Sequence, residues 1–183
     1  MKKRADAAVK RTAGAAAGPA STPLRFNLWL FFGFLILVLD QGTKLYFNQG
    51  LDPGDAWPVA RLGDAGIQFV LAHNRGAAFS FLADAGGWQR WLFSGLALAV
   101  IVVGLRMLWR HNHQRLFSFS VVLLLAGALG NLIDRVSLGY VIDFIDCFWG
   151  RWHWPAFNVA DIAICAGCFA LVIDELLGVS RGR

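Results

Sequence analysis

Two aspartates in the last third of the chain are placed for acid–base chemistry. Asp143 and Asp161 stand beside apolar residues in the stretch DFIDCFWGRWHWPAFNVADIAI (143–164). Gly150 and Pro155 break the chain between them, so a hairpin can bring the two carboxyl groups to the same level. Two carboxylates in one apolar pocket do not both ionise cheaply, and such a pair can activate water and protonate a leaving group. On the residues alone, a proton or ion pathway and a structural polar cluster stay open as alternatives.

The neighbours of these aspartates predict their surroundings. Asp161 lies about one turn into a helix expected to begin near Phe157, where the positive end of the helix dipole favours an ionised carboxylate. Asn158 can either cap that helix or orient the carboxylate. Asp146 is a rival member of the pair, but its neighbours predict a position at the rim of the site.

Polar residues also interrupt the first and third apolar segments. A carboxylate inside a membrane costs at least ~2.5 kcal/mol, so Asp40 predicts a buried partner and hence a site. Lys44 follows one helical turn later. One explanation is an ion pair with Asp40 in which the ammonium group snorkels to the outer interface, and the other is a part in the site.

Near the end of the third segment, Asn131 and Arg135 are four residues apart and share a helix face. One explanation is a helix end at the membrane surface, where Asp134 and Arg135 simply meet water. That explanation suits Asp134 but leaves Asn131 unexplained.

The elements that position these residues are predicted to be membrane helices. The 183-residue chain is 57% hydrophobic and has a mean hydropathy of +0.52, well above a typical soluble domain. A membrane-spanning helix needs about 20 residues. Four apolar segments reach this length, at about 27–47, 88–109, 116–136 and 156–178. We therefore expect an all-α membrane domain over residues 26–179.

The connection between the first two helices, 48–87, is expected to form a small β-element on the outer face. Two segments in it, Trp57–Ala60 and Gly66–Ala72, alternate like short strands, and a short half-helix is expected from Gly76.

The distribution of Lys and Arg predicts the orientation of the helices. Most basic residues lie in the tail 1–25, in the turn between the second and third helices, and in the C-terminal residues 180–183. The positive-inside rule places these regions, and hence both termini, in the cytoplasm. The tail is expected to be disordered, and the first apolar segment to remain as an anchor rather than being cleaved.

Several other kinds of site are not supported. The net charge of +5 comes without a basic face carrying aromatic platforms, so nucleic-acid binding is not expected. The three cysteines do not form a disulfide framework pattern. His73 and His153 are predicted outside the membrane and His111 and His113 inside, so no metal site is expected.

Four sequence blocks occur in order: LDQGTK (39–44), NRGAAFS (74–80), GNLIDRVSLGYVIDF (130–144) and FNVAD (157–161). With these blocks the chain resembles lipoprotein signal peptidase, the bacterial membrane aspartyl peptidase also called signal peptidase II. The resemblance covers about residues 27–178. It implies four transmembrane helices, a periplasmic β-cradle and a short helix in the first outer connection.

The resemblance also implies roles for individual residues. The catalytic pair falls on Asp143 and Asp161. Supporting or substrate-binding polar positions fall within the same blocks: Asp40, Lys44, Asn74, Gly76, Asn131, Arg135 and Asn158.

The implied substrate is a prolipoprotein whose lipobox Cys carries a diacylglyceryl group, cleaved on the N-terminal side of that Cys. The implied protein is a monomer in the bacterial inner membrane, in contact with membrane lipids, with its active site on the periplasmic side. It needs no metal or organic cofactor.

Two functions of other classes are weighed against this one. A small proton or ion transporter could use Asp40, Asp134 and Asp161, but it leaves the outer β-element unexplained. A membrane scaffold could use the same polar residues only to hold its helices together.

Overall fold

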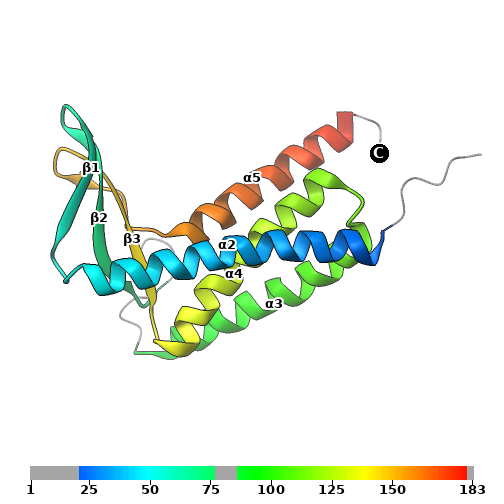
Figure 1. Cartoon of the computed structure of the whole chain (residues 1–183), viewed down its shortest axis with the longest axis horizontal. Helices are drawn as coiled ribbons and strands as arrows, with labels where there is room; N and C mark the ends of the chain where they lie inside the picture. The colour runs from blue at the N-terminus through cyan, green and yellow to red at the C-terminus, as the bar shows by residue number, and fades with distance from the viewer. Residues whose placement is uncertain (1–20, 77–85, 181–183) are drawn as a thin grey trace, which may run out of the picture.

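The computed structural model describes residues 21–76 and 86–180, which form a helical bundle with a small sheet at one end (Figure 1). The helices in these ranges are α2 (Pro23–Gly50), α3 (Trp88–His111), α4 (Arg115–Ser137) and α5 (Val159–Ser180). The strands are β1 (Ala56–Leu62), β2 (Ala65–Asn74), β3 (Val141–Trp149) and β4 (Trp152–His153).

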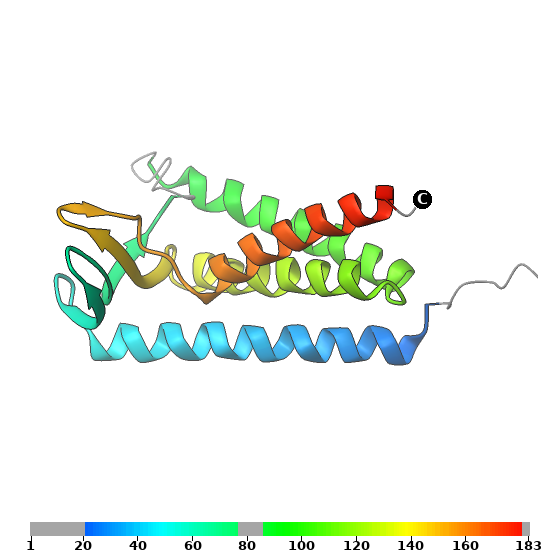
Figure 2. The same ribbon diagram turned by 90° about the horizontal axis from the view of Figure 1, so that it is seen from above.

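Helix α4 is the central element of the bundle. It packs against α2, α3 and α5, and Figure 2 shows it running between α2 on one side and α3 and α5 on the other. Because α4 is surrounded, most of its apolar residues are buried by protein, whereas α2 and α3 expose theirs. The start of α2 and the end of α5 lie together at the end of the bundle away from the sheet (Figure 1).

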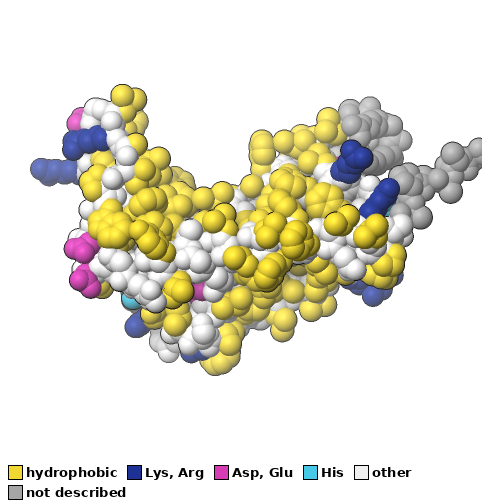
Figure 3. Space-filling model, viewed as in Figure 1, with side chains coloured by type: hydrophobic (Ala, Val, Ile, Leu, Met, Phe, Trp, Pro, Cys, Tyr) yellow, Lys and Arg dark blue, Asp and Glu magenta, His cyan; other side chains and the backbone are white. Residues whose placement is uncertain are grey.

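Three of the described helices, α2, α3 and α4, are long and apolar enough to cross a membrane. Apolar side chains cover the middle of the face shown in Figure 3, and the charged side chains lie mostly toward its two ends. A soluble protein rarely exposes such a continuous apolar surface. The prediction of apolar membrane helices with a small antiparallel sheet is therefore confirmed.

The helix ends differ from the predicted ones by a few residues. Helix α2 begins at Pro23 because Thr22 caps it: the Thr22 side-chain oxygen accepts from the amide of Arg25 at 3.3 Å. Residues 21–25 therefore belong to the cap and first turn of α2 rather than to the predicted tail, and residues 1–20 lie outside the described residues. Helix α5 begins at Val159, after the cap residue Asn158, rather than at 156.

Glycines in α4 allow its neighbours to approach closely. A Cβ atom at Gly127 would overlap the carbonyl oxygen of Ala160 in α5, and one at Gly130 would overlap the carboxylate of Asp40 in α2. Small residues at such positions bring helix backbones together in membranes. This close packing lets polar groups of α2, α4 and α5 meet beneath the sheet.

The sheet is antiparallel with the strand order β1-β2-β3-β4. The predicted β-element within 48–87 contains β1 and β2, but β3 and β4, which complete the sheet, come from residues 141–153 and were not predicted. Strand β3 pairs with β2 and brings Asp143 opposite Ala72. Apolar and polar residues do not alternate clearly along β3, since residues on both faces of the strand are buried.

Two structural details connect the sheet to the bundle. Gly139, with φ of 87°, turns the chain between α4 and β3. Phe47 of α2 stacks on Phe144 of β3 with a centroid distance of 4.5 Å, beside the buried Leu51. The half-helix predicted from Gly76 lies outside the described residues.

The packing at Gly127 generates a stability prediction. Gly127→Ala should lower the free energy of unfolding by ~1–3 kcal/mol, because the new methyl group overlaps backbone that cannot move away easily. Thermal unfolding of the purified protein in detergent would measure this. Gly42→Ala in α2 is the matched control, since no atom lies within 4 Å of the added methyl group. Equal melting temperatures for the two variants would contradict the packing argument.

Candidate active site

Asp143 projects from β3 into the protein at the base of the sheet. Asp143 is buried, with only 2% of its surface exposed. The Asn158 side chain donates to its Oδ1 at 2.7 Å, and the Asn74 side chain donates to its Oδ2 at 3.0 Å. Asn74 ends β2, so the pairing of β2 with β3 places this donor beside the carboxyl group.

Asp161 lies in the first turn of α5 and is held by two asparagines. Asn158 and Asp161 cap the helix reciprocally: the Asp161 amide donates to Asn158 Oδ1 at 3.0 Å, and the Asn158 amide donates to Asp161 Oδ2 at 3.2 Å. The Asn131 side chain donates to Asp161 Oδ1 at 2.8 Å.

Asn158 therefore does both things that the sequence left open, since its side chain caps α5 and its backbone amide holds the Asp161 carboxylate. In addition, its side-chain nitrogen donates to Asp143. One asparagine thus contacts both aspartates, which come from β3 and α5 and meet at the sheet end of the bundle.

The environment of Asp143 favours its protonated form. Burial, with a smaller contribution from the charge of Asp161, raises the pKa of Asp143 from 3.8 to about 7. The hydrogen bonds from Asn74 and Asn158 and the charge of Lys44 lower the same pKa to a smaller extent. A carboxyl group with a pKa near 7 can act as a proton donor or acceptor at neutral pH.

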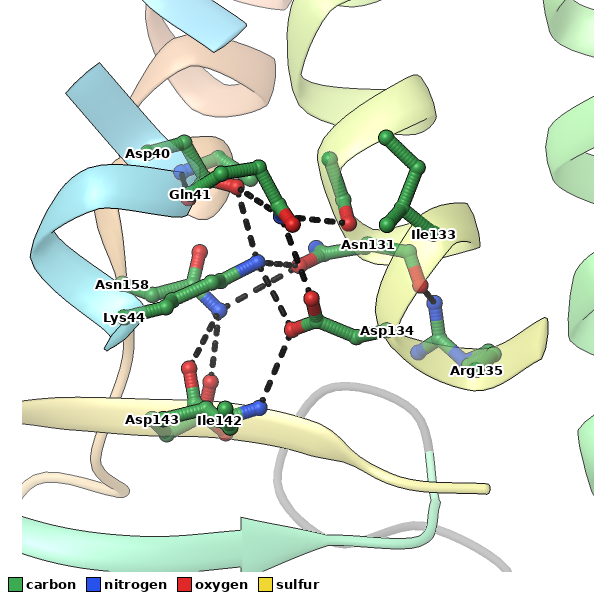
Figure 4. A network of polar contacts seen from close by, with 12 residues as sticks. Asp40, Gln41, Lys44, Asn131, Ile133, Asp134, Arg135, Ile142, Asp143 and Asn158 are labelled. Atoms are coloured by element: carbon green, nitrogen blue, oxygen red, sulfur yellow. Dashed lines mark hydrogen bonds and ion pairs between the residues drawn. The ribbon is translucent and has the colours of Figure 1, made fainter. Parts of the chain in front are cut away.

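A network of charges lies behind this pair (Figure 4). The Lys44 ammonium group lies 2.9 Å from Asp40 Oδ2 and 3.0 Å from Asp134 Oδ2, and it donates to Asn131 Oδ1 at 3.0 Å. The predicted pair of Asp40 with Lys44 is present. The prediction that Lys44 snorkels to the interface is wrong, because the residue is 1% exposed and its ammonium group has three partners inside the protein.

Arg135 connects α4 to the segment that follows β2. Its guanidinium group donates to the Gly76 carbonyl oxygen at 3.2 Å and to the Asn131 carbonyl oxygen at 3.4 Å. It also lies over the ring of Phe93, 5.5 Å from the centroid. The Gly76 amide in turn donates to Asn74 Oδ1 at 2.9 Å, so Gly76 is held from both sides.

The family model described as signal peptidase (SPase) II matches residues 32–177. The chain belongs to the signal peptidase II family.

Relatives in this family align over most of their length. The chain is 50% identical over 165 residues to a lipoprotein signal peptidase of Cupriavidus taiwanensis, covering 90% of each chain. It is 44% identical over 173 residues to a lipoprotein signal peptidase of Burkholderia mallei, covering 94% of this chain and 99% of the relative. A solved structure described as a bacterial membrane enzyme matches with a TM-score of 0.75 and 26% identity, covering 86% of this chain and 92% of that one.

In this signal peptidase II family member, the prediction for Asp134 is wrong. The residue is 3% exposed rather than in contact with water. Its Oδ2 accepts the amide of Ile142 at 3.2 Å in addition to pairing with Lys44.

Gln41, which the sequence did not single out, donates to Asp40, to the Gly130 carbonyl oxygen and to Asp134 at 3.1–3.2 Å. The signals for Gln41 and Asp134 in the sequence were weak: Gln41 directly follows Asp40, and Asp134 lies one helical turn beyond Asn131.

The rim position predicted for Asp146 is also wrong. Asp146 is buried within the sheet, where its Oδ2 accepts from the Gln68 side chain at 2.8 Å and lies 2.7 Å from His153 Nδ1. Its partners Gln68 and His153 lie in β2 and β4, so Asp146 belongs to a separate cluster that joins β2, β3 and β4. Within residues 21–76 and 86–180, no group of three or more His, Cys, Asp or Glu side chains is arranged to hold a metal ion.

The raised pKa of Asp143 generates a pH prediction. Between about pH 4 and pH 7 the folded protein keeps a proton on Asp143 that the unfolded chain has released, so the contribution of Asp143 to stability falls as pH rises through this window and levels off above it. Asp143→Asn should remove this contribution. The melting temperature of the variant relative to the parent should therefore rise from pH 4 to pH 7.

The control for this measurement is Asp52→Asn, which changes an exposed carboxylate on the loop after α2. Its melting temperature should follow that of the parent across the same pH range. If Asp143→Asn also runs parallel to the parent, Asp143 does not carry a raised pKa.

Proposed function

We propose that this chain removes the signal peptides of prolipoproteins by aspartic peptidase chemistry at Asp143 and Asp161. The observation that supports this most directly is that the buried Asp143 and the partly buried Asp161 are joined through Asn158, in a chain of the signal peptidase II family. The relatives named lipoprotein signal peptidase align across this whole region.

The two carboxyl groups take different roles in the proposed reaction. Asp161 is the ionised member, because the amide of Asn158 and the side chain of Asn131 donate to it at the positive end of α5. It takes a proton from the attacking water. Asp143 is the protonated member and hydrogen-bonds the scissile carbonyl oxygen, and a proton then reaches the leaving amine. The pair titrates as a unit.

The remaining predicted site residues form a support around the pair. Asn74, Asn131 and Asn158 orient the two carboxyl groups directly. Asp40 and Lys44 lie behind them in the charge network. Arg135 and Gly76 lie at the border of the site, where backbone donors and acceptors can hold an extended substrate segment.

We further propose that α5 crosses the membrane as a fourth span. Its 22 residues extend about 33 Å, enough for a hydrocarbon core of about 30 Å. The described chain ends of α2 and α5 lie at one end of the bundle, and the basic residues of the sequence favour the cytoplasm for that end. The sheet and the site then lie on the periplasmic side of the bacterial inner membrane.

This placement suits a lipid-modified substrate. A signal helix and acyl chains can enter sideways from the bilayer, so the scissile bond before a diacylglyceryl-modified Cys reaches the aspartates at its natural depth. The proposed peptidase unit is the monomer, residues 26–179. Ion transport is not favoured, since Asp40 and Asp134, two of the carboxylates it needs, are both paired with Lys44 inside the protein.

Replacing either aspartate tests the assignment. Asp143→Asn and Asp161→Asn should each lower the rate of cleavage of a diacylglyceryl-modified prolipoprotein by at least ~1000-fold, because each removes a proton-transfer group. Gel-shift or mass-spectrometric detection of the released signal peptide would measure the rate. Asp146→Asn is the matched control in the same strand and should retain cleavage. Turnover by Asp143→Asn together with loss in Asp146→Asn would show that the wrong aspartate was chosen.

A second test concerns the lipid on the substrate. Purified protein in detergent should cleave the diacylglyceryl-modified prolipoprotein, and the unlipidated protein of the same sequence should be cleaved at least ~100-fold more slowly. The acyl chains supply binding energy of about 0.8 kcal/mol per buried methylene group. Equal rates on the two substrates would rule out the proposed lipid-modified substrate class while leaving the aspartate chemistry intact.

A further inference from the structure

Two buried carboxylates outside the proposed pair hold the backbone immediately before each member of it. Asp134 Oδ2 accepts the amide of Ile142 at 3.2 Å, and Ile142 precedes Asp143. Asp40 Oδ1 accepts the amide of Ala160 at 2.8 Å, and Ala160 precedes Asp161. The same contact is therefore made twice, once on β3 and once on α5.

The two supporting carboxylates are joined to each other. Lys44 Nζ bridges Asp40 Oδ2 and Asp134 Oδ2 at 2.9 Å and 3.0 Å. Gln41 Nε2 bridges Asp40 Oδ2 and Asp134 Oδ1, both at 3.1 Å. Figure 4 shows Lys44 and Gln41 reaching from α2 toward Asp134 on α4. We call Asp40, Gln41, Lys44 and Asp134 the strut.

The charges in the strut make its length hard to change. Asp40, Lys44 and Asp134 are each at most 3% exposed, so two negative charges and one positive charge are shielded from water. Separating a buried ion pair leaves an uncompensated charge inside the protein, which is strongly unfavourable. Hydrogen bonds from a backbone amide to a carboxylate are also stronger than neutral ones. The strut thus resists changes in the distance between its two carboxylates.

From these contacts we infer that Asp134 is a positioning residue for peptide cleavage and that the strut sets the separation of Asp143 and Asp161. Asp134 fixes the strand position of Asp143, Asp40 fixes the helix position of Asp161, and Lys44 with Gln41 fixes the spacing between them. This inference rests on the proposed function, because it takes Asp143 and Asp161 as the reacting pair.

A second connection joins the same two segments without involving the strut. The amide of Ile145 donates to the Phe157 carbonyl oxygen at 2.9 Å, and the amide of Phe157 donates to the Ile145 carbonyl oxygen at 3.0 Å. This bridge holds β3 beside the residues that lead into α5, two residues away from Asp143. It serves as an internal reference, since loss of the strut should leave it intact.

The experiment combines amide hydrogen exchange with kinetics on the full chain in detergent. Asp134→Ala should remove exchange protection at Ile142 and leave Ala160 and Ile145 protected. Asp40→Ala should remove protection at Ala160 and leave Ile142 and Ile145 protected. A role confined to general folding would instead reduce protection at all three amides in both variants, and that result would overturn the inference.

Cleavage of the diacylglyceryl-modified prolipoprotein gives the functional readout. In Asp134→Ala, kcat should fall ~100-fold, the effect of a misplacement of about 1 Å, while KM stays within about twofold because the substrate contacts remain. A kcat within twofold of the parent, with Ile142 unprotected, would overturn the inference. Asp52→Asn serves as the control for loss of a carboxylate far from the strut.

A second variant keeps the test decisive if Asp134→Ala does not fold. Asp134→Asn preserves the side-chain volume and an oxygen that can accept the Ile142 amide, but it removes the charge that pairs with Lys44. It should show an intermediate loss of kcat and of Ile142 protection. A full loss of kcat with Ile142 protection unchanged would show that Asp134 does not act through the backbone and would overturn the inference. Asp143→Asn, assayed alongside, separates failure of this inference from failure of the proposed pair.

Discussion

The rest of the site depends on the pairing of the buried Lys44 ammonium group with two carboxylates. This group lies between Asp40 and Asp134 and also donates to Asn131, so it connects α2 with the central helix α4 beside the proposed catalytic pair. Two carboxylates could not stay buried this close together without it, because a buried charge without a partner is costly. The cation therefore lets the protein use ionised groups as rigid structural contacts inside an apolar bundle.

The packing of the helices follows from the same requirement. Asp40 can reach the amide of Ala160 only where α2, α4 and α5 converge, and Gly127 and Gly130 leave the space for this convergence. The small residues that α4 buries, such as Gly127, contribute little apolar contact themselves. They allow a short distance between polar groups on three helices.

Much of this arrangement could be predicted from the sequence, and there are physical reasons why the rest could not. The apolar helices follow from hydropathy, and helix rules give capping as one of two possible roles for Asn158. The cost of placing carboxylates beside apolar residues draws attention to Asp143 and Asp161, and the four sequence blocks make them the expected pair. Strand β3 was missed because both of its faces are buried, which removes the alternation that marks a strand. The burial of Asp134 was missed because an aspartate at a helix end ordinarily meets water. Its burial is favourable only because Lys44, distant in the sequence, lies beside it in the folded protein.

The pairing of β2 with β3 sets an order for the assembly of the protein. These strands are neighbours in the sheet, yet α3 and α4 lie between them in the chain. The hairpin of α3 and α4 must therefore leave and return to the sheet end before β3 can find β2, and such distant pairing forms slowly. Asp143 comes opposite Ala72 only at that late stage. A newly synthesised chain consequently cannot bring Asp143 and Asp161, the proposed catalytic pair, together until most of its helices have been made, so the proposed site is complete only in the fully assembled protein.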